Sequence, residues 1–333
     1  MAEGNGVLVV AEQHGGTLAP VTDELMGLGR KVADQLGQPL HAVVIGSGVQ
    51  DLGQELVQLG ADKVTVIDAP VFQNYQNATY TAAIEKLVRQ TGAPMLLLFA
   101  ASFQGRDLAP RVAFRLDAGI GTNVLDVNVQ GPGQPVQMVR AAYGGNAQQL
   151  LEIKTTPQIA TIWPKSQDAA QRDPSRTGEV VTFDPGVDES AAVAKVVEQR
   201  KEVAGGAKLE DAEIVISGGR GLGGPEPFKQ LEELAQVMGG AVGASRAAVD
   251  AGWIPPAHQV GLTGVAVSPK LYIAIAISGA SQHMAGIGGA KTIVTINKDP
   301  EAALFARSRY GVVTDFKQFM PAFIEKVREL VGR

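Results

Sequence analysis

The chain contains no cysteine among its 333 residues. This absence excludes disulfide bonds, cysteine-ligated iron–sulfur clusters and a thiol nucleophile. Any redox chemistry must therefore come from an organic cofactor. Histidine is also scarce, and His14, His41, His258 and His283 lack the spacing of a metal site.

Charge of one sign and long apolar runs are lacking as well. The formal net charge is only -5, so nothing suggests a nucleic-acid partner. The longest apolar run, Pro94–Ala101, suits one buried strand and is too short to span a membrane. Residues 1–6 do not form the charged start of a signal peptide. We expect an unprocessed, soluble, cytoplasmic protein without a membrane span.

The length of the chain favours two domains, and its composition is typical of α/β proteins. In the first half, short apolar runs alternate with amphipathic segments. This alternation predicts a parallel sheet, because each crossover helix returns the chain to the same end of the sheet. The predicted strands are Gly6–Ala11, Pro39–Ile45, Lys63–Asp68 and Met95–Ala100. The predicted helices are Pro20–Leu36, Gln50–Leu59, Asn77–Gln90 and Asp107–Leu116.

The pattern changes to shorter β-like runs from Asp126 onward. The predicted runs are Val136–Tyr143, Gln149–Lys154 and Gln158–Ile162. A charged helix is predicted over Ala192–Gly206, where the segment ends in two glycines. We therefore place the domain boundary near Gly205, which gives an N-terminal α/β domain of residues 1–205 and a C-terminal domain of residues 206–333.

The C-terminal domain again alternates strands with helices, which predicts a doubly wound α/β domain. Its ligand should lie at the carboxyl ends of the strands, where loops and helix starts converge. The predicted strands are Ala212–Ser217, Leu271–Ile277, Thr292–Asn297 and Gly311–Thr314. The predicted helices are Pro227–Met238, Ser281–Ile287 and Phe316–Val331, and Gly239–Gly264 is expected to be rich in loops.

A glycine-rich segment, Gly219–Gly224, follows the first of these strands and satisfies the pattern G-x-G-x-x-G. This pattern is a dinucleotide-binding fingerprint when a helix start follows it. Two features argue against an ordinary NAD site: no acidic residue ends a second strand about twenty residues further on, and Arg220 stands inside the motif. A glycine turn that binds nothing is the alternative.

Four further motifs place polar side chains beside small residues. Gly243–Arg246 offers one hydroxyl and one guanidinium on a segment that a flat ligand can approach. In Gln259–Gly264, a threonine hydroxyl precedes a glycine and can point at a ligand without crowding. Ser278–His283 opens a predicted helix, with Ser281 as the expected N-cap. Asn297–Pro300 ends a strand. Each motif alone is also compatible with a turn or with a structural histidine.

Taken together and in this order, the motifs closely resemble the FAD-binding domain of the electron transfer flavoprotein alpha subunit. The resemblance covers nearly the whole chain and is strongest from Ser217 to Asp315. It implies two domains, each a mainly parallel sheet flanked by helices, of which the C-terminal one is Rossmann-like and binds FAD. It also implies that the N-terminal domain pairs with a beta subunit, and that FAD lies between the C-terminal domain and that subunit.

The resemblance also implies which residues contact FAD. Ser245 and Asn297 would face the nucleotide. Arg246, Thr263 and His283 would face the flavin ring, with Thr263 at N5 and His283 at O2 as an imidazolium or an N–H donor. The full implied set is Arg220, Ser245, Arg246, Gln259, Val260, Gly261, Leu262, Thr263, Ser278, Gly279, Ala280, Ser281, Gln282, His283, Asn297, Lys298, Asp315 and Phe316.

The chain departs from the family pattern at three positions close to these motifs. Leu262 stands where the family usually has Gln, Val265 where it usually has Lys, and Ser281 where it usually has Ile. We expect FAD binding to be retained and the redox potential to differ from that of relatives.

The same resemblance implies that the chain acts as an electron carrier and not as an enzyme. FAD would accept electrons from donor dehydrogenases and pass them to a quinone-linked or other acceptor, while the partner beta subunit holds AMP. One alternative is an electron-bifurcating complex, in which the beta subunit carries a second FAD. The other is a nicotinamide-dependent dehydrogenase built on the fingerprint of Gly219–Gly224.

Overall fold

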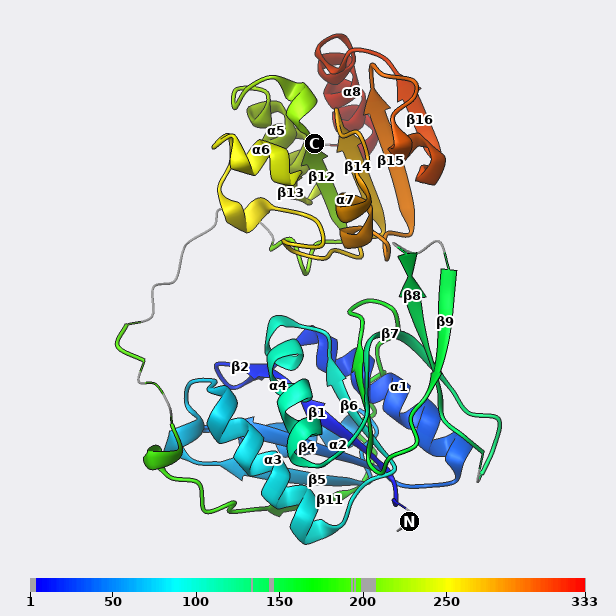
Figure 1. The fold of residues 1–333 in the computed structure, drawn as a ribbon. Helices are drawn as coiled ribbons and strands as arrows, with labels where there is room; N and C mark the ends of the chain where they lie inside the picture. Colours follow the sequence, from blue (N-terminus) through cyan, green and yellow to red (C-terminus); the bar gives the residue numbers. More distant parts are fainter. Residues whose placement is uncertain are drawn as a thin grey trace. The chain divides into compact units, whose positions relative to one another are not determined.

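The computed structural model describes residues 4–132, 134–143, 147–192, 194, 196–198 and 208–332. The chain divides into two compact units (Figure 1). The division in the linker falls between residues 200 and 201. We call them the N-terminal unit and the C-terminal unit. The predicted boundary near Gly205 lies outside the described residues. No helix in the described ranges is both long enough and apolar enough to cross a membrane.

The N-terminal unit is built on a nine-stranded sheet with the order β11-β5-β4-β1-β6-β10-β7-β8-β9. Neighbouring strands are parallel from β11 to β7, and β8 and β9 extend the sheet as an antiparallel hairpin. The strands are β1 (Val7–Ala11), β4 (Leu40–Gly46), β5 (Lys63–Asp68), β6 (Leu96–Ala100), β7 (Ile120–Asn128), β8 (Gln137–Ala142), β9 (Ala147–Glu152), β10 (Gln158–Ile162) and β11 (Glu179–Thr182). The short strands β2 (Gln13–His14) and β3 (Thr17–Leu18) form a separate hairpin.

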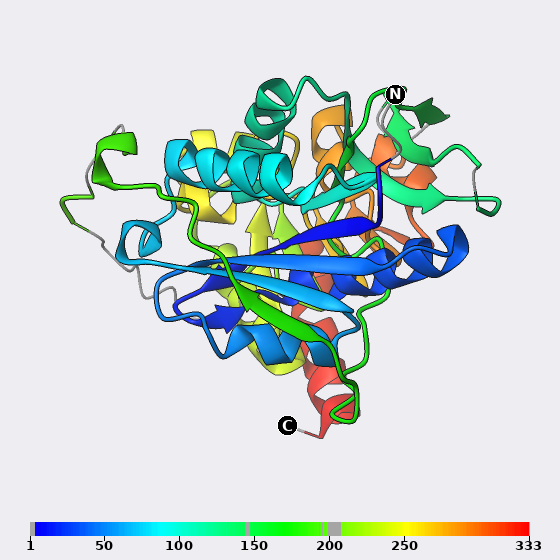
Figure 2. The same ribbon diagram turned by 90° about the horizontal axis from the view of Figure 1, so that it is seen from below.

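Alternating side chains of the strands bury both faces of this sheet. In β1, Val7 and Val9 belong to one hydrophobic core, and Leu8 and Val10 to another. Helices α1 (Pro20–Leu36) and α2 (Leu52–Gln58) cover the first face, and α3 (Asn77–Thr91) and α4 (Phe103–Arg115) cover the second. Figure 2 shows helices on both sides of the strands. The predicted parallel α/β architecture is confirmed.

Several elements of the N-terminal unit differ from the prediction. Strands β7 and β11 were not expected. Helix α4 begins at Phe103, four residues earlier than predicted, because the Ser102 hydroxyl caps it by accepting a hydrogen bond from Gly105 N at 2.9 Å. The helix predicted over 192–206 falls largely outside the described residues, and its described positions 192, 194 and 196–198 are not helical.

The C-terminal unit has a five-stranded, fully parallel sheet with the order β13-β12-β14-β15-β16. The strands are β12 (Ile214–Gly218), β13 (Ala241–Ala244), β14 (Leu271–Ile275), β15 (Thr292–Asn297) and β16 (Tyr310–Val313). Helices α5 (Phe228–Met238), α6 (Arg246–Asp250) and α8 (Phe316–Val331) pack on one face. Helix α7 (Ser281–Gly286) and the segment 259–268 lie on the other. The order reverses direction at β12, so a crevice is expected beside its carboxyl end.

Short 3₁₀ helices complete the two units, at Pro70–Phe72, Glu189–Ala191, Arg220–Leu222, Pro256–His258 and Ala303–Arg307. The segment 239–264, predicted to be rich in loops, contains β13 and α6. The prediction of Ser281 as an N-cap is wrong: Ala280 occupies the cap position and Ser281 is the first helical residue.

Candidate functional site

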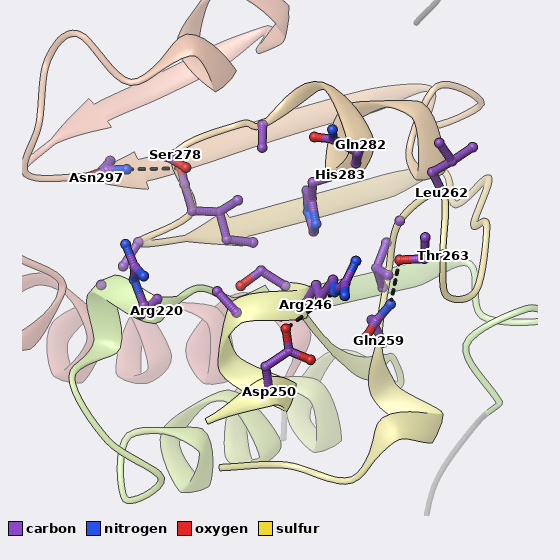
Figure 3. Close-up of a pocket in the computed structure, with 18 of the residues that line it drawn as sticks. Arg220, Arg246, Asp250, Gln259, Leu262, Thr263, Ser278, Gln282, His283 and Asn297 are labelled. Atoms are coloured by element: carbon purple, nitrogen blue, oxygen red, sulfur yellow. Dashed lines mark hydrogen bonds and ion pairs between the residues drawn. The ribbon is translucent and has the colours of Figure 1, made fainter. Parts of the chain in front are cut away.

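A cavity of about 610 Å³ opens at the carboxyl end of the C-terminal sheet. Four strands deliver residues to it. Arg220 follows β12, Ser278 follows β14 and Asn297 ends β15 (Figure 3). Ser245 follows β13. Its size lies within the usual range for small-molecule and cofactor sites. The lining consists of Arg220, Gly221, Ser245, Arg246, Ala247, Asp250, Gln259, Val260, Gly261, Leu262, Thr263, Ala276, Ile277, Ser278, Ala280, Gln282, His283, Asn297 and Asp299.

The glycine-rich turn after β12 does not form a dinucleotide fingerprint. The chain turns into a 3₁₀ helix at Arg220, and α5 begins only at Phe228, so no α-helix start directly follows the glycines. A Cβ atom on Gly219 would lie 2.1 Å from the carbonyl oxygen of Ala276, and a Cβ atom on Gly221 would lie 3.0 Å from the Cβ of Ala276. The glycines therefore allow this turn to pack against the end of β14.

Ala276 forms part of the cavity wall in an unusual backbone conformation. Its φ is 56°, in the left-handed region that residues other than glycine rarely adopt. Two hydrogen bonds hold it: its N–H donates to Ile296 O at 2.8 Å, and its carbonyl accepts from Gly221 N at 3.3 Å. Strand β15 and the 3₁₀ turn after β12 thus fix the wall at this point.

The loop that carries Thr263 is tied to both β13 and α7. Val260 N donates to Ala244 O at 2.9 Å, and Leu262 N donates to Gln282 O at 2.8 Å. Within the loop, the Gln259 side-chain amide donates to the Thr263 hydroxyl at 3.0 Å. These contacts bring the threonine to the same cavity as the first turn of α7.

Two arginines supply positive charge at the cavity. Arg246 is exposed, and its Nε lies 3.3 Å from Oδ2 of Asp250, one helical turn further along α6. Arg220 is also exposed and forms no ion pair with a described residue. Ser245 is the N-cap residue of α6, but its hydroxyl makes no capping hydrogen bond. Both guanidiniums, and this hydroxyl, are available to an electron-rich ligand.

His283 is a buried polar side chain of the site, with an exposed fraction of 6%. Its Nε2 lies 2.9 Å from the Tyr272 hydroxyl, whereas its buried Nδ1 has no hydrogen-bond partner among the described residues. Burial lowers the pKa of His283 to about 4, against a smaller opposing effect of the Val260 backbone. The ring is therefore neutral at pH 7 in this state, which favours the predicted N–H donor over the imidazolium.

Family models match both units of the chain. The electron transfer flavoprotein domain matches residues 7–188, and the electron transfer flavoprotein FAD-binding domain matches residues 208–288. The first match alone covers more than half of the 333 residues. The chain belongs to the electron transfer flavoprotein alpha-subunit family.

Curated members of the electron transfer flavoprotein alpha-subunit family match this chain over nearly its full length. The electron transfer flavoprotein subunit alpha of Thermoanaerobacterium thermosaccharolyticum is 43% identical, with 97% of this chain and 98% of that protein covered. The subunit alpha of Megasphaera elsdenii is 41% identical, with 100% and 99% covered. The protein FixB of Azorhizobium caulinodans is 37% identical, with 97% and 88% covered.

Most residues that the family resemblance implied are brought together at the cavity. They are Arg220, Ser245, Arg246, Gln259, Val260, Gly261, Leu262, Thr263, Ser278, Ala280, Gln282, His283 and Asn297. Asn297 is only 9% exposed, and its amide is already used: Nδ2 donates to Ile277 O at 3.0 Å and Oδ1 accepts from Asp299 N at 3.1 Å. Its main contribution in this structure is to join the ends of β14 and β15.

Five residues of the implied set do not line the cavity. Gly279 packs against Leu304, and Lys298 and Ser281 are exposed outside it. Asp315 caps α8 by accepting a hydrogen bond from Lys317 N at 2.9 Å. Phe316 is 6% exposed in the hydrophobic core under α8, so it would have to leave that core to reach a ligand.

The cavity also contains residues outside the implied set: Gly221, Ala247, Asp250, Ala276, Ile277 and Asp299. Asp250 had a detectable signal, because it follows Arg246 at the i,i+4 spacing of a helical ion pair. Of the three departures from the family pattern, Leu262 lines the cavity, Val265 packs on the neighbouring core, and Ser281 lies outside the cavity.

Proposed function

We propose that the C-terminal unit binds one FAD in the cavity at the carboxyl end of its sheet, and that the chain thereby carries electrons. The observation that carries this proposal is the composition of the cavity. Side chains from four strand ends and from α7 converge on one space within a unit that matches the FAD-binding domain family. Bound FAD supplies the redox chemistry, and the protein residues bind and orient it.

The unpaired groups of the cavity fit an electron-rich ligand such as FAD. Arg220 offers a free guanidinium, Ser245 a free hydroxyl, and His283 a buried Nδ1 without a partner among the described residues. The backbone N–H groups of Ser278 and Ala280 also donate to no described backbone carbonyl. A diphosphate and the carbonyl groups of a flavin are acceptors that such donors would satisfy.

Each residue has a distinct proposed role. Arg220 and Ser245 bind the phosphate portion, where the side chains following β12 and β13 meet. On the ring side, Arg246 places a positive charge that favours the reduced, more negative flavin. Thr263, oriented by Gln259, and His283 present hydrogen-bonding groups to the ring.

The same proposal includes a beta subunit as the partner, which pairs with the N-terminal unit and holds AMP. Donor dehydrogenases would supply electrons and a quinone-linked or other acceptor would receive them. No residue need act as a nucleophile or general base, so the chain is proposed as a carrier and not an enzyme. A bifurcating complex, with a second FAD in the beta subunit, is the alternative. The nicotinamide dehydrogenase loses its main support, because the turn at Gly219 serves packing against β14.

Co-expression with a beta subunit from the same organism tests the proposal. The purified complex should be yellow and contain one FAD per heterodimer, or two if it bifurcates. Arg220→Ala should lower the FAD content, whereas Arg309→Ala, an exposed arginine outside the cavity, should leave it unchanged. A colourless complex that takes up no added FAD would contradict the proposal.

A further inference from the structure

A buried tyrosine contacts the histidine of the cavity from behind. Tyr272 lies on β14 with an exposed fraction of 0%, and its hydroxyl oxygen is 2.9 Å from Nε2 of His283. On the neighbouring strand β12, Ser217 is also fully buried. The Ser217 hydroxyl opposes part of the rise in the Tyr272 pKa that burial causes. Ser217 Oγ nevertheless forms no hydrogen bond of standard geometry with a described residue.

The protonation of the two partners limits how they can bond. Burial raises the pKa of Tyr272, so its hydroxyl stays protonated and needs a hydrogen-bond acceptor. Burial also keeps His283 neutral, so its ring carries one proton, on either Nδ1 or Nε2. Two arrangements follow: the tyrosine donates to Nε2 and the proton sits on Nδ1, or Nε2–H donates to the tyrosine oxygen.

The second arrangement leaves a buried donor without an acceptor. If Nε2–H donated, the Tyr272 hydrogen would need another acceptor, and Ser217 Oγ is not within hydrogen-bonding geometry. An unsatisfied buried donor destabilises the folded protein. The first arrangement satisfies the tyrosine and leaves Nδ1–H as a donor.

We propose that Tyr272 is a positioning residue that holds the proton of His283 on Nδ1, so that this ring presents an N–H donor to the ligand of the cavity. Figure 3 shows the labelled His283 ring projecting into the space lined by the other cavity residues. The proposal rests on the proposed function, since an N–H donor suits the flavin carbonyl groups and an unprotonated nitrogen would repel them. Tyr272 itself does not line the cavity.

Nitrogen NMR of ring-labelled histidine in the full complex, with and without FAD, tests this inference directly. The wild type should show Nδ1 of His283 protonated and Nε2 unprotonated, and His283→Gln assigns the signals among the 4 histidines. Tyr272→Phe removes the donor at nearly constant shape, so the proton should shift towards Nε2, the nitrogen that the free side chain prefers. Tyr310→Phe, at a tyrosine that is 59% exposed, should leave the signals unchanged.

The outcomes separate this inference from the proposed function. A wild-type ring protonated on Nε2, or a Tyr272→Phe ring that stays protonated on Nδ1, would overturn the inference even if FAD binds. If the complex takes up no added FAD but its His283 ring is protonated on Nδ1, the proposed function is overturned and the positioning role is supported. If Tyr272→Phe fails to fold, the wild-type spectrum still decides, and Ser217→Ala should keep the Nδ1 proton because its hydroxyl does not accept from Tyr272.

Discussion

The two units carry the same kind of parallel sheet, but their carboxyl ends are used differently. In the N-terminal unit, the strand order reverses between β1 and β6, where a ligand crevice would be expected. Glu12 follows β1 at this place with an exposed fraction of 4%, and its carboxyl accepts a hydrogen bond from the Ser102 hydroxyl at 2.6 Å. In the C-terminal unit, the corresponding place opens into the cavity.

The difference lies in the charge of the groups at the usual binding position, a carboxyl in one unit and a guanidinium in the other. Ser102 also caps α4, so Glu12 directs its own carboxyl towards a helix start, where a parallel α/β domain often holds an anionic ligand. The C-terminal unit instead leaves its Arg220 guanidinium and its Ser245 hydroxyl uncommitted. The two ends therefore make opposite predictions for substitution: stability should respond at Glu12, and ligand binding at the cavity.

The largest effect is expected from Glu12→Gln, through the pH dependence of stability. Burial raises the pKa of Glu12 to about 7 from its ordinary value of 4.5, against the opposing Ser102 hydrogen bond. The unfolded chain therefore ionises this carboxyl at lower pH than the folded chain. The free energy of unfolding should fall as pH rises from 4.5 towards 7, by up to roughly 3 kcal/mol.

Glutamine stays neutral and can still accept from Ser102, so Glu12→Gln should match the wild type near pH 4.5 and exceed its stability at pH 8. Denaturant midpoints across this range measure the difference. Glu232→Gln, at an exposed position on α5, is the control and should retain the wild-type profile. If Glu12→Gln also retains the wild-type profile, the carboxyl end of the N-terminal sheet does not carry an ionisation cost.

The next largest effect is expected from Gly219→Ala at the open end. The new Cβ would meet the Ala276 carbonyl at 2.1 Å and force the turn away from β14. Overpacking of this kind costs roughly 1–3 kcal/mol, and FAD content should fall with it. Gly288→Ala is the matched control, because its nearest contact would be at 3.8 Å. Equal denaturant midpoints for the Gly219→Ala and Gly288→Ala variants would show that close packing at Gly219 is not required for stability.

A smaller effect is expected from Arg246→Ala, which removes one positive charge from the cavity. Because the side chain is exposed, the interaction is worth about 1 kcal/mol, and the flavin potential should fall since the reduced ring is the more negative form. Arg246→Lys should keep the flavin potential close to the wild-type value if the positive charge alone sets it. The potential should fall as in Arg246→Ala if the planar guanidinium is required. Spectroelectrochemical titration of the complex measures both, and an unaltered potential in Arg246→Ala would remove this role.

The smallest effect is expected from Asp250→Asn, in the opposite direction. Its carboxylate lies 3.3 Å from Arg246 Nε and offsets the charge of that side chain. Removing it should raise the flavin potential, by an amount corresponding to about 0.2–1 kcal/mol. Glu329→Gln, which breaks the pair with Lys326 on α8 outside the cavity, should have no effect. A lowered potential in Asp250→Asn would mean that the carboxylate orients Arg246 and does not merely neutralise it.

Strands and helices with a strong periodic pattern were predictable from the sequence. Lys63–Asp68, Thr292–Asn297 and Pro20–Leu36 have the predicted bounds, because a buried strand or an amphipathic helix dictates its own pattern. Strand β11 was not predictable: its four residues become a strand only by pairing with β5, more than a hundred residues earlier in the chain. Strand β7 contains a register shift and a left-handed residue at Asn123, which interrupt its alternation.

The candidate site was predictable to the extent that motifs follow strand ends. Parallel strands bring their carboxyl ends together, so His283 and Asn297, which follow or end predicted strands, could be expected in one place. Arg246 and Thr263 stood in a segment predicted as loops, and only the family resemblance placed them at the same site. Phe316 could not be judged in this way, because a hydrophobic residue at a helix start suits a core and a ligand site equally well. The hydrogen bond between Tyr272 and His283 also left no trace in the sequence, since only the fold places β14 beneath α7.

Ala276, with its left-handed backbone, has a consequence for the thermodynamics of association. A wall residue in a sparsely populated conformation is held by hydrogen bonds from Gly221 and to Ile296, and these form when the sheet forms. The loss of conformational entropy at this point therefore belongs to folding and not to ligand capture. A ligand therefore meets a preorganised surface at this point. Replacing Ala276 with glycine should relax the backbone strain but let the wall sample more conformations, so the entropy of ligand association should become less favourable.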